Sequence, residues 1–184
     1  MAKGKNRKLI KDYIKTYPDW PVKGVDFRDT SGLCNGPGLR LAQNYLYDRL
    51  LKYKHIVDRI VAVDARGFIF GGVLAHRFDK PLVLARKKGK LPGATHGQEF
   101  KLEYGSATIE IQSDAIHDGE SVIIIDDLLA TGGTALSVIN IIQREWKANV
   151  IAFGCVVNLP DLKGEYLISQ LDIPVVKAVE YKGS

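Results

Sequence analysis

The chain has 184 residues, of which 46% are hydrophobic and 26% charged, proportions that allow one folded domain with a substantial core. It begins with a basic, polar segment and contains no apolar run of membrane-spanning length, so we expect a cytoplasmic protein with neither a secretory signal nor a membrane anchor. The net charge of +5 favours an anionic partner, such as a polyphosphate substrate or a nucleic acid.

The predicted elements begin with a short helix that extends to about Tyr17, where Pro18 and Pro21 stop it. Residues 21–37 are rich in glycine, aspartate and proline, and we expect an irregular arm there. Apolar residues then recur at helical spacing from Leu39 to about Tyr53, which predicts an amphipathic helix.

Short apolar runs alternate with helical segments through the rest of the chain. The predicted strands are residues 60–63, 81–85, 122–125, 150–157 and 174–179, and the predicted helices are 68–78 and 135–146. Apolar strands separated by helices indicate an α/β fold, a single-domain open parallel twisted sheet flanked by helices. Residues 88–111 are polar and glycine-rich and then alternate, which predicts a hairpin with a flexible loop. We therefore divide the chain into an N-terminal arm and hood, residues 1–35, and a core, residues 36–184.

The two cysteines, Cys34 and Cys155, lie far apart and show no metal-ligand spacing. A disulfide is not expected in a cytoplasmic chain. We expect two buried or half-buried thiols and no metal site built from protein ligands.

The turn that follows residues 122–125 reads Asp-Asp-Leu-Leu-Ala-Thr-Gly-Gly-Thr and leads into a helix. Ligands of open α/β sheets bind at such turns. Glycines let the backbone approach a ligand, and the N-terminus of a helix suits a phosphate. A capped helix with Thr134 at its N-cap would explain the glycines, but not two adjacent carboxylates after an apolar strand. Asp126 and Asp127 are suited to accept hydrogen bonds from sugar hydroxyls.

This stretch resembles the phosphoribosyl-diphosphate signature of the type I phosphoribosyltransferases, and the predicted fold is the one that this family adopts. The resemblance implies that Asp126 and Asp127 bind the ribose 2′ and 3′ hydroxyls. It also implies that the 5′-phosphate binds to the turn formed by Ala130, Thr131, Gly132, Gly133 and Thr134.

Two further segments follow predicted strands and resemble the adenine branch of the same family. They read ARGFIFG and RKKGKLPG, and alone they would be an ordinary turn and a solvated cluster of charges. The resemblance implies a site for the diphosphate formed by Asp64, Ala65, Arg66, Arg86, Lys90 and, from the flexible loop, Tyr104. Basic groups around a multiply charged leaving group are chemically reasonable.

The flexible loop contains FKLEYG, which resembles a loop motif of the adenine branch whose glutamate exchanges a proton with the purine. Adenine loses a proton when its N9 bonds to the anomeric carbon, and a carboxylate within hydrogen-bond reach can accept it. We therefore expect Glu103 to be the catalytic residue. We also expect the loop to close over the substrates and exclude water.

The arm reads PVKGVDFRDT at residues 21–30 and resembles the hood of the adenine branch. The resemblance implies that Phe27 stacks on the purine and that backbone groups of Asp26 and Arg28 bind the adenine edge. Asp26 replaces an apolar residue of the usual pattern, Asn158 a glutamate and Glu165 an arginine. These departures concern the base pocket and leave the ribose and diphosphate sites intact.

The resemblance spans about residues 17–179 and implies transfer of the phosphoribosyl group from 5-phosphoribosyl 1-diphosphate to adenine, giving AMP and diphosphate in purine salvage. It also implies a homodimer and Mg2+ bound mainly by substrate oxygens. Two alternatives stay open, namely transfer to another purine, and a non-catalytic regulator that senses the sugar diphosphate and binds nucleic acid. The Glu103 loop and the lack of an added DNA-binding domain favour the enzyme, so we expect neither a nucleic-acid nor a membrane partner.

Overall fold

The computed structural model describes residues 9–101 and 106–183. Within them a seven-stranded sheet has the order β5-β6-β4-β3-β7-β8-β9, and β1 and β2 form a separate two-stranded sheet. The strands are β1 Lys15–Tyr17, β2 Phe27–Asp29, β3 Arg59–Val63, β4 Leu82–Lys87, β5 Thr95–Lys101, β6 Ser106–Gln112, β7 Ser121–Leu129, β8 Asn149–Asn158 and β9 Val175–Glu180. The α-helices are α2 Gly38–Leu50, α3 Gly67–Phe78, α4 Gly133–Trp146 and α5 Gly164–Ser169, and short 3-10 helices are η1 Thr30–Cys34, η2 Leu51–Tyr53 and η3 Pro160–Leu162.

The main sheet confirms the predicted α/β fold. Strands β4, β3, β7, β8 and β9 are mutually parallel, whereas β6 pairs antiparallel with both β4 and β5. The two antiparallel strands belong to the predicted hairpin, which needs no helical crossover because its strands run in opposite directions. The sheet is therefore mixed and mostly parallel.

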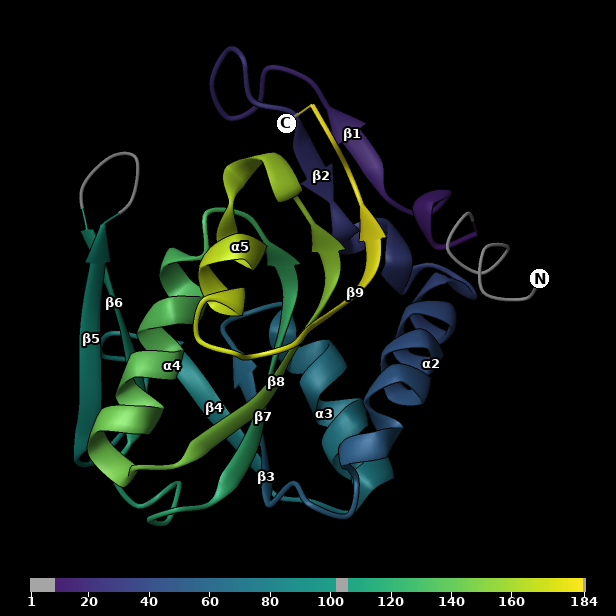
Figure 1. Cartoon of the computed structure of the whole chain (residues 1–184). Helices are drawn as coiled ribbons and strands as arrows, with labels where there is room; N and C mark the ends of the chain where they lie inside the picture. Colours follow the sequence, from purple (N-terminus) through teal and green to yellow (C-terminus); the bar gives the residue numbers. More distant parts are fainter. Residues whose placement is uncertain (1–8, 102–105, 184) are drawn as a thin grey trace.

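Helices cover both faces of this sheet, with α4 on one face and α2 and α3 on the other (Figure 1). Strand β7 supplies both cores, because successive side chains of a strand point to opposite faces. Ile124 packs in the core beneath α4, whereas Ile123 and Ile125 pack in the core beneath α2 and α3. All three are fully buried, which explains the unbroken apolar run that precedes Asp126.

The N-terminal segment differs from the prediction. The helical conformation ends at Lys11, and Lys15–Tyr17 forms β1, which pairs with β2 of the arm. The arm therefore contains a strand and a 3-10 helix rather than only irregular chain. The prediction was wrong because β1 has three exposed residues and depends on a partner strand ten or more residues away.

The two cysteines are free, and only Cys155 is buried, whereas Cys34 is exposed at the end of η1. The expectation for Cys34 was therefore wrong. Among the described residues, no helix has both the length and the hydrophobicity that a membrane crossing requires.

Candidate functional site

Three cavities lie along the carboxyl edge of the central strands. The first, of about 550 Å³, follows the turn between β7 and α4. The second, of about 390 Å³, lies between that turn and the turn after β3, and the third, of about 310 Å³, lies in the hood. The first two share Asp126, Leu128 and Thr134, and Arg66 lines the second and third. Because they share these walls, the three cavities adjoin and form one extended site.

The turn between β7 and α4 leaves the helix N-terminus available to a ligand. Gly132 is the N-cap in the left-handed conformation (φ 85°), which glycine adopts readily, and no side chain bonds to the helix end. Thr134 lies inside the helix, so the alternative in which it caps the helix is wrong. The first N–H groups of a helix have no partners within it, and Gly132, Gly133 and Thr134 line the first cavity. The predicted residues Ala130 and Thr131 line it too.

The shape of this turn depends on Gly164, the first residue of α5. The Gly164 N–H donates a hydrogen bond to the Ala130 carbonyl oxygen (3.0 Å). A Cβ atom on Gly164 would lie 2.3 Å from that oxygen, so only glycine fits there. Sequence reasoning missed this residue, because the contact joins segments that are far apart in the chain.

The acid pair lies in a strand rather than in the turn, because β7 continues to Leu129 and pairs with β8 along that extension. Asp126 is half-buried and lines the first two cavities. Asp127 is 6% exposed and lines the second. Its Oδ2 accepts a hydrogen bond from Thr30 Oγ1 (2.8 Å) and lies 2.6 Å from Arg66 Nε.

Burial raises the pKa of Asp126 well above its ordinary value, and the neighbouring Asp127 carboxylate raises it further. The Asp127 N–H, which donates to Asp126 Oδ1 (2.8 Å), opposes this shift in part. Hydroxyl groups that donate hydrogen bonds to the pair would stabilise its charged form. The pair is therefore suited to a ligand with neighbouring hydroxyls.

The turn after β3 brings Asp64, Ala65 and Arg66 to the wall of the second cavity. The following helix lies very close to the acid pair, since a Cβ on Gly67 would lie 2.8 Å from the Ile125 carbonyl oxygen. This close approach places the start of α3 directly against β7.

The basic cluster after β4 is only partly in the cavity. Arg86 Nε lies 3.5 Å from Asp64 Oδ2, and Arg86 Nη1 donates to the Lys90 carbonyl oxygen (3.0 Å). Arg86 and Lys90 are therefore brought together beside Asp64, but the residue of this cluster that lines the cavity is Lys87, which sequence reasoning did not select.

The hood cavity is lined by aromatic side chains. Phe27 makes an edge-to-face contact with Trp20 (ring centroids 4.3 Å apart), and both line the cavity together with Tyr17. Arg28 is buried, donates to Thr16 Oγ1 (2.5 Å), pairs with Asp26 (3.3 Å) and lies over the Tyr181 ring. The side chains of Asp26 and Arg28 thus bind each other and the core. Trp20 was not predicted.

The other two departures from the family pattern contact each other. Asn158 Nδ2 donates to Glu165 Oε2 (2.6 Å), and the other oxygen of Glu165 binds Lys177. Glu165 adjoins Gly164, so this polar cluster fixes the start of α5 next to the turn between β7 and α4.

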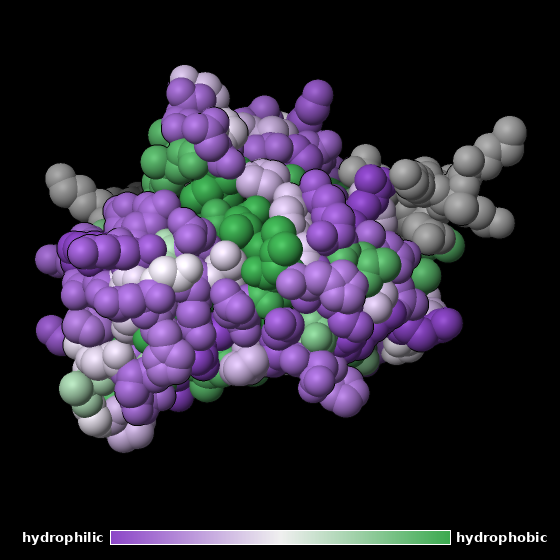
Figure 2. All heavy atoms as spheres, turned by 60° about the horizontal axis from the view of Figure 1, so that its bottom comes forward, coloured by the Kyte–Doolittle hydropathy of each residue, from purple (hydrophilic) through white to green (hydrophobic). Residues whose placement is uncertain are grey.

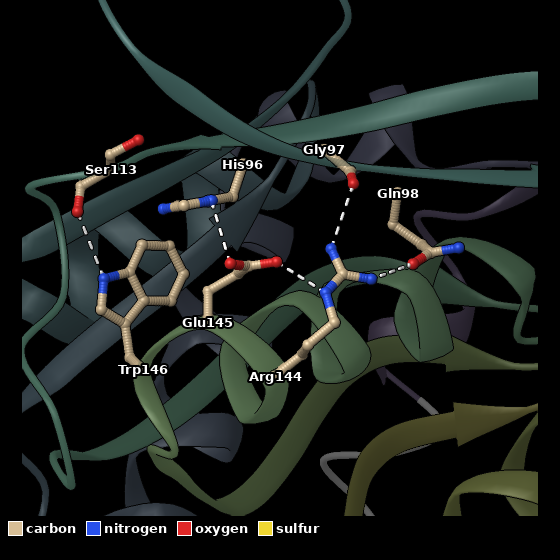
Figure 3. A network of polar contacts seen from close by, with 7 residues as sticks. All are labelled: His96, Gly97, Gln98, Ser113, Arg144, Glu145 and Trp146. Atoms are coloured by element: carbon tan, nitrogen blue, oxygen red, sulfur yellow. Dashed lines mark hydrogen bonds and ion pairs between the residues drawn. The ribbon is translucent and has the colours of Figure 1, made fainter.

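The hairpin that carries the predicted loop is attached to α4 by a polar network (Figure 3). Arg144 of α4 donates to Gln98 and Gly97 of β5, and Glu145 lies 3.1 Å from His96 Nδ1. The hydrogen bond from Arg144 lowers the pKa of Glu145. Glu103 and Tyr104 themselves lie outside the described residues, so their predicted roles stay predictions.

Comparison with known proteins gives one consistent result. Residues 35–178 match the family described as phosphoribosyl transferase domain. The chain is 44% identical over 178 residues to the adenine phosphoribosyltransferase of Dinoroseobacter shibae and 45% identical over 178 residues to that of Jannaschia sp.. Both alignments cover 96% of this chain and 98% of the relative.

Solved structures with this fold carry the same description. The adenine phosphoribosyltransferase of Rhodothermus marinus superposes with a TM-score of 0.87 at 36% identity, covering 97% of this chain and 99% of that one. The Saccharomyces cerevisiae enzyme, in complex with an imino-altritol bisphosphate and adenine, superposes with a TM-score of 0.86 at 32% identity, covering 95% and 99%.

Proposed function

Because the chain belongs to the phosphoribosyl transferase family, we propose that its three adjoining cavities bind phosphoribosyl diphosphate and adenine side by side. The protein is an enzyme of purine salvage that transfers the phosphoribosyl group to adenine and releases diphosphate. The observation that carries the assignment of the site is the acid pair Asp126–Asp127 between a glycine turn and an aromatic hood.

The 5′-phosphate binds in the first cavity, to the free N–H groups at the start of α4 and to the hydroxyls of Thr131 and Thr134. The ribose hydroxyls donate hydrogen bonds to Asp126 and Asp127. This arrangement is supported by the raised pKa of Asp126, which hydroxyl donors would bring down.

The diphosphate lies along the turn of Asp64, Ala65 and Arg66, with Arg86, Lys90 and Tyr104 on its other side. Lys87, which lines the same cavity, adds positive charge. As the C1′–O bond to the diphosphate breaks, negative charge accumulates on the leaving oxygen, and fixed cations stabilise it.

Adenine binds in the N-terminal arm and hood, residues 1–35, whose strands β1 and β2 form a sheet of their own. Phe27 and Trp20 offer an aromatic wall, and backbone groups of Asp26 and Arg28 bind the edge of the base. The N9–C1′ bond forms on the face of the ribose opposite the departing diphosphate as the C1′–O bond breaks, and Glu103 accepts the N9 proton.

The enzyme uses Mg2+ held mainly by oxygens of phosphoribosyl diphosphate, where the ion neutralises charge on the leaving group. The acid pair fits this role, since Asp126 and Asp127 offer carboxylate oxygens to the second cavity. A hard cation that keeps substrate and water ligands needs few protein oxygens, and Asp126 can supply one. Removal of divalent cations with EDTA should abolish turnover, and added Mg2+ should restore it.

The enzyme is a cytoplasmic homodimer. Ile69 of α3 and Leu82 of β4 are 38% and 40% exposed, and a Cβ on Gly72 would contact Leu82, so α3 and β4 share a surface. Exposed apolar side chains often mark interfaces. Apolar surface also gathers in the middle of the face that Figure 2 shows. Light scattering of purified protein should give twice the mass of 20.4 kDa.

A turnover assay with phosphoribosyl diphosphate and four bases tests the function. We expect adenine to be converted to AMP far faster than hypoxanthine, guanine or xanthine. Preference for another base would favour the sibling enzyme. Salt-sensitive binding of nucleic acid without any turnover would instead favour the regulator.

A further inference from the structure

Thr30 occupies an unusual place between the hood and the ribose site. It is the first residue of η1, which Asp29 caps by accepting a hydrogen bond from the Ser31 N–H (2.8 Å). Asp29 and Ser31 both line the hood cavity. Thr30, between them, is 3% exposed and turns away from the hood toward β7.

The position of η1 is itself tightly defined. A Cβ on Gly32 would lie 2.2 Å from the Tyr13 carbonyl oxygen, so η1 packs directly on the N-terminal segment. Leu33 is fully buried in the core beneath α2 and α3. Thr30 therefore has little freedom to move away from its partner.

That partner is Asp127, 97 residues further along the chain, whose Oδ2 accepts the Thr30 hydroxyl at 2.8 Å. The same oxygen lies 2.6 Å from Arg66 Nε. A carboxylate oxygen has two lone pairs, so the two donors together occupy Oδ2. The other oxygen, Oδ1, is then the one offered to a hydroxyl of the ligand.

The two donors differ in how firmly they hold the carboxylate. The Arg66 side chain is 40% exposed and lines two cavities that bind charged or aromatic groups, so it can change partners when ligands enter. Thr30 is buried and lines none of the three cavities, so its hydroxyl does not face the ligands. Thr30 alone therefore keeps the carboxylate orientation constant through the reaction.

We propose that Thr30 is a positioning residue, whose buried hydroxyl holds Asp127 in the orientation that binds the ribose hydroxyls and joins the hood to the ribose site. This inference rests on the proposed function and gives a role to Thr30, the last residue of the arm motif, to which the resemblance assigns none.

The test compares binding of AMP and of 2′,3′-dideoxy-AMP by titration calorimetry. Thr30→Val keeps the shape of the side chain and removes the hydroxyl, whereas Thr30→Ser keeps the hydroxyl. We expect Thr30→Val to lower the affinity for AMP about fivefold, as for the loss of one hydrogen bond, and to leave the affinity for the dideoxy ligand unchanged. Thr30→Ser should bind both ligands as the wild type does, and so should the control Thr108→Val on β6.

A structural defect would weaken both ligands by the same factor, because the dideoxy ligand shares the phosphate and base contacts. Equal losses for the two ligands, or no loss for either, would therefore overturn the inference. If Thr30→Val does not fold, Thr30→Ala provides the same comparison. Wild-type protein that binds neither ligand would contradict the proposed function itself, a result distinct from wild-type binding without selective loss in the variant.

Discussion

The hood and the turn between β7 and α4 are built in opposite ways. Strand β7 pairs with β3 on one side and β8 on the other, and its apolar run 122–125 is fully buried in two cores. The hood consists of two three-residue strands that pair only with each other, and Trp20 is 52% exposed. The hood is attached to the core through contacts such as Thr30 with Asp127 and Arg28 with Tyr181.

The two regions therefore have different roles in ligand binding. The part that holds the sugar phosphate is supported by a strand that is paired on both sides and largely buried, so its groups are fixed before the ligand binds. The part that holds the base has fewer buried contacts, and such segments open at low free-energy cost. Base recognition therefore depends on a small number of contacts that join the hood to the core.

The largest expected effect comes from a substitution that changes the proton transfer and leaves both the turn and the hood unaltered. Glu103→Gln should lower kcat at least about 100-fold, because it removes the group that accepts the N9 proton. AMP affinity should stay close to that of the wild type, since neither the turn nor the hood is altered. Single-turnover kinetics check the loss of rate, and calorimetry checks the affinity for AMP. Near-normal turnover would exclude the role of Glu103.

The second-largest expected effect comes from a substitution that distorts the turn between β7 and α4. Gly164→Ala would place Cβ 2.3 Å from the Ala130 carbonyl oxygen, so the turn must shift. We expect AMP affinity to fall about 30-fold and stability to fall by about 1–3 kcal/mol, as for other overpacked sites. In the matched control Gly72→Ala the nearest atom would be 4.0 Å away, and affinity should not change. Equal affinity in both variants would show that α5 does not shape the turn.

A smaller effect should be confined to the hood. Arg28→Met removes the buried guanidinium that binds Thr16 and Asp26. We expect the KM for adenine to rise about tenfold, whereas the KM for phosphoribosyl diphosphate should change less than about twofold. Lys11→Met is the control, because the exposed Lys11 also lies over the Tyr181 ring but makes a weaker contact. A parallel rise in both KM values would contradict the separation of the two regions.

The smallest effect concerns stability. Burial raises the pKa of Asp126, so the folded protein binds a proton more tightly than the unfolded chain does. Wild-type stability should therefore decline as the pH rises above the ordinary carboxyl pKa of 3.8, up to the raised value. Asp126→Asn removes this loss and should raise Tm at neutral pH by about 2–4 °C, with a smaller gain near pH 4.

Thermal melts at several pH values measure this difference. The exposed Asp118→Asn should leave Tm unchanged throughout the range. A gain from Asp126→Asn that does not grow with pH would show that the acid pair is not strained in the absence of a ligand.

Features that lie within one stretch of sequence could be predicted. The β7–α4 turn was predictable because its strand, acids, glycines and helix follow one another directly. Even there, the extension of β7 to Leu129 was missed, since it depends on pairing with β8. The apolar runs gave the parallel strands for the same local reason.

Features that join distant segments could not be predicted. Strand β1 exists only because β2 pairs with it, and Gly164 shapes a turn more than thirty residues before it. Thr30 is the last residue of the arm motif, and only the fold places it against Asp127. The departures Asn158 and Glu165 looked unrelated in sequence, and the structure shows that they share a hydrogen bond.

A crystal structure with AMP bound tests the central claim most directly. We expect the 5′-phosphate on the N–H groups of Gly132–Thr134, a ribose hydroxyl within hydrogen-bond distance of Asp127 Oδ1, and adenine against Phe27 in the hood. The Thr30 bond to Asp127 Oδ2 should be retained. A phosphate bound elsewhere, or a base outside the hood cavity, would contradict the account.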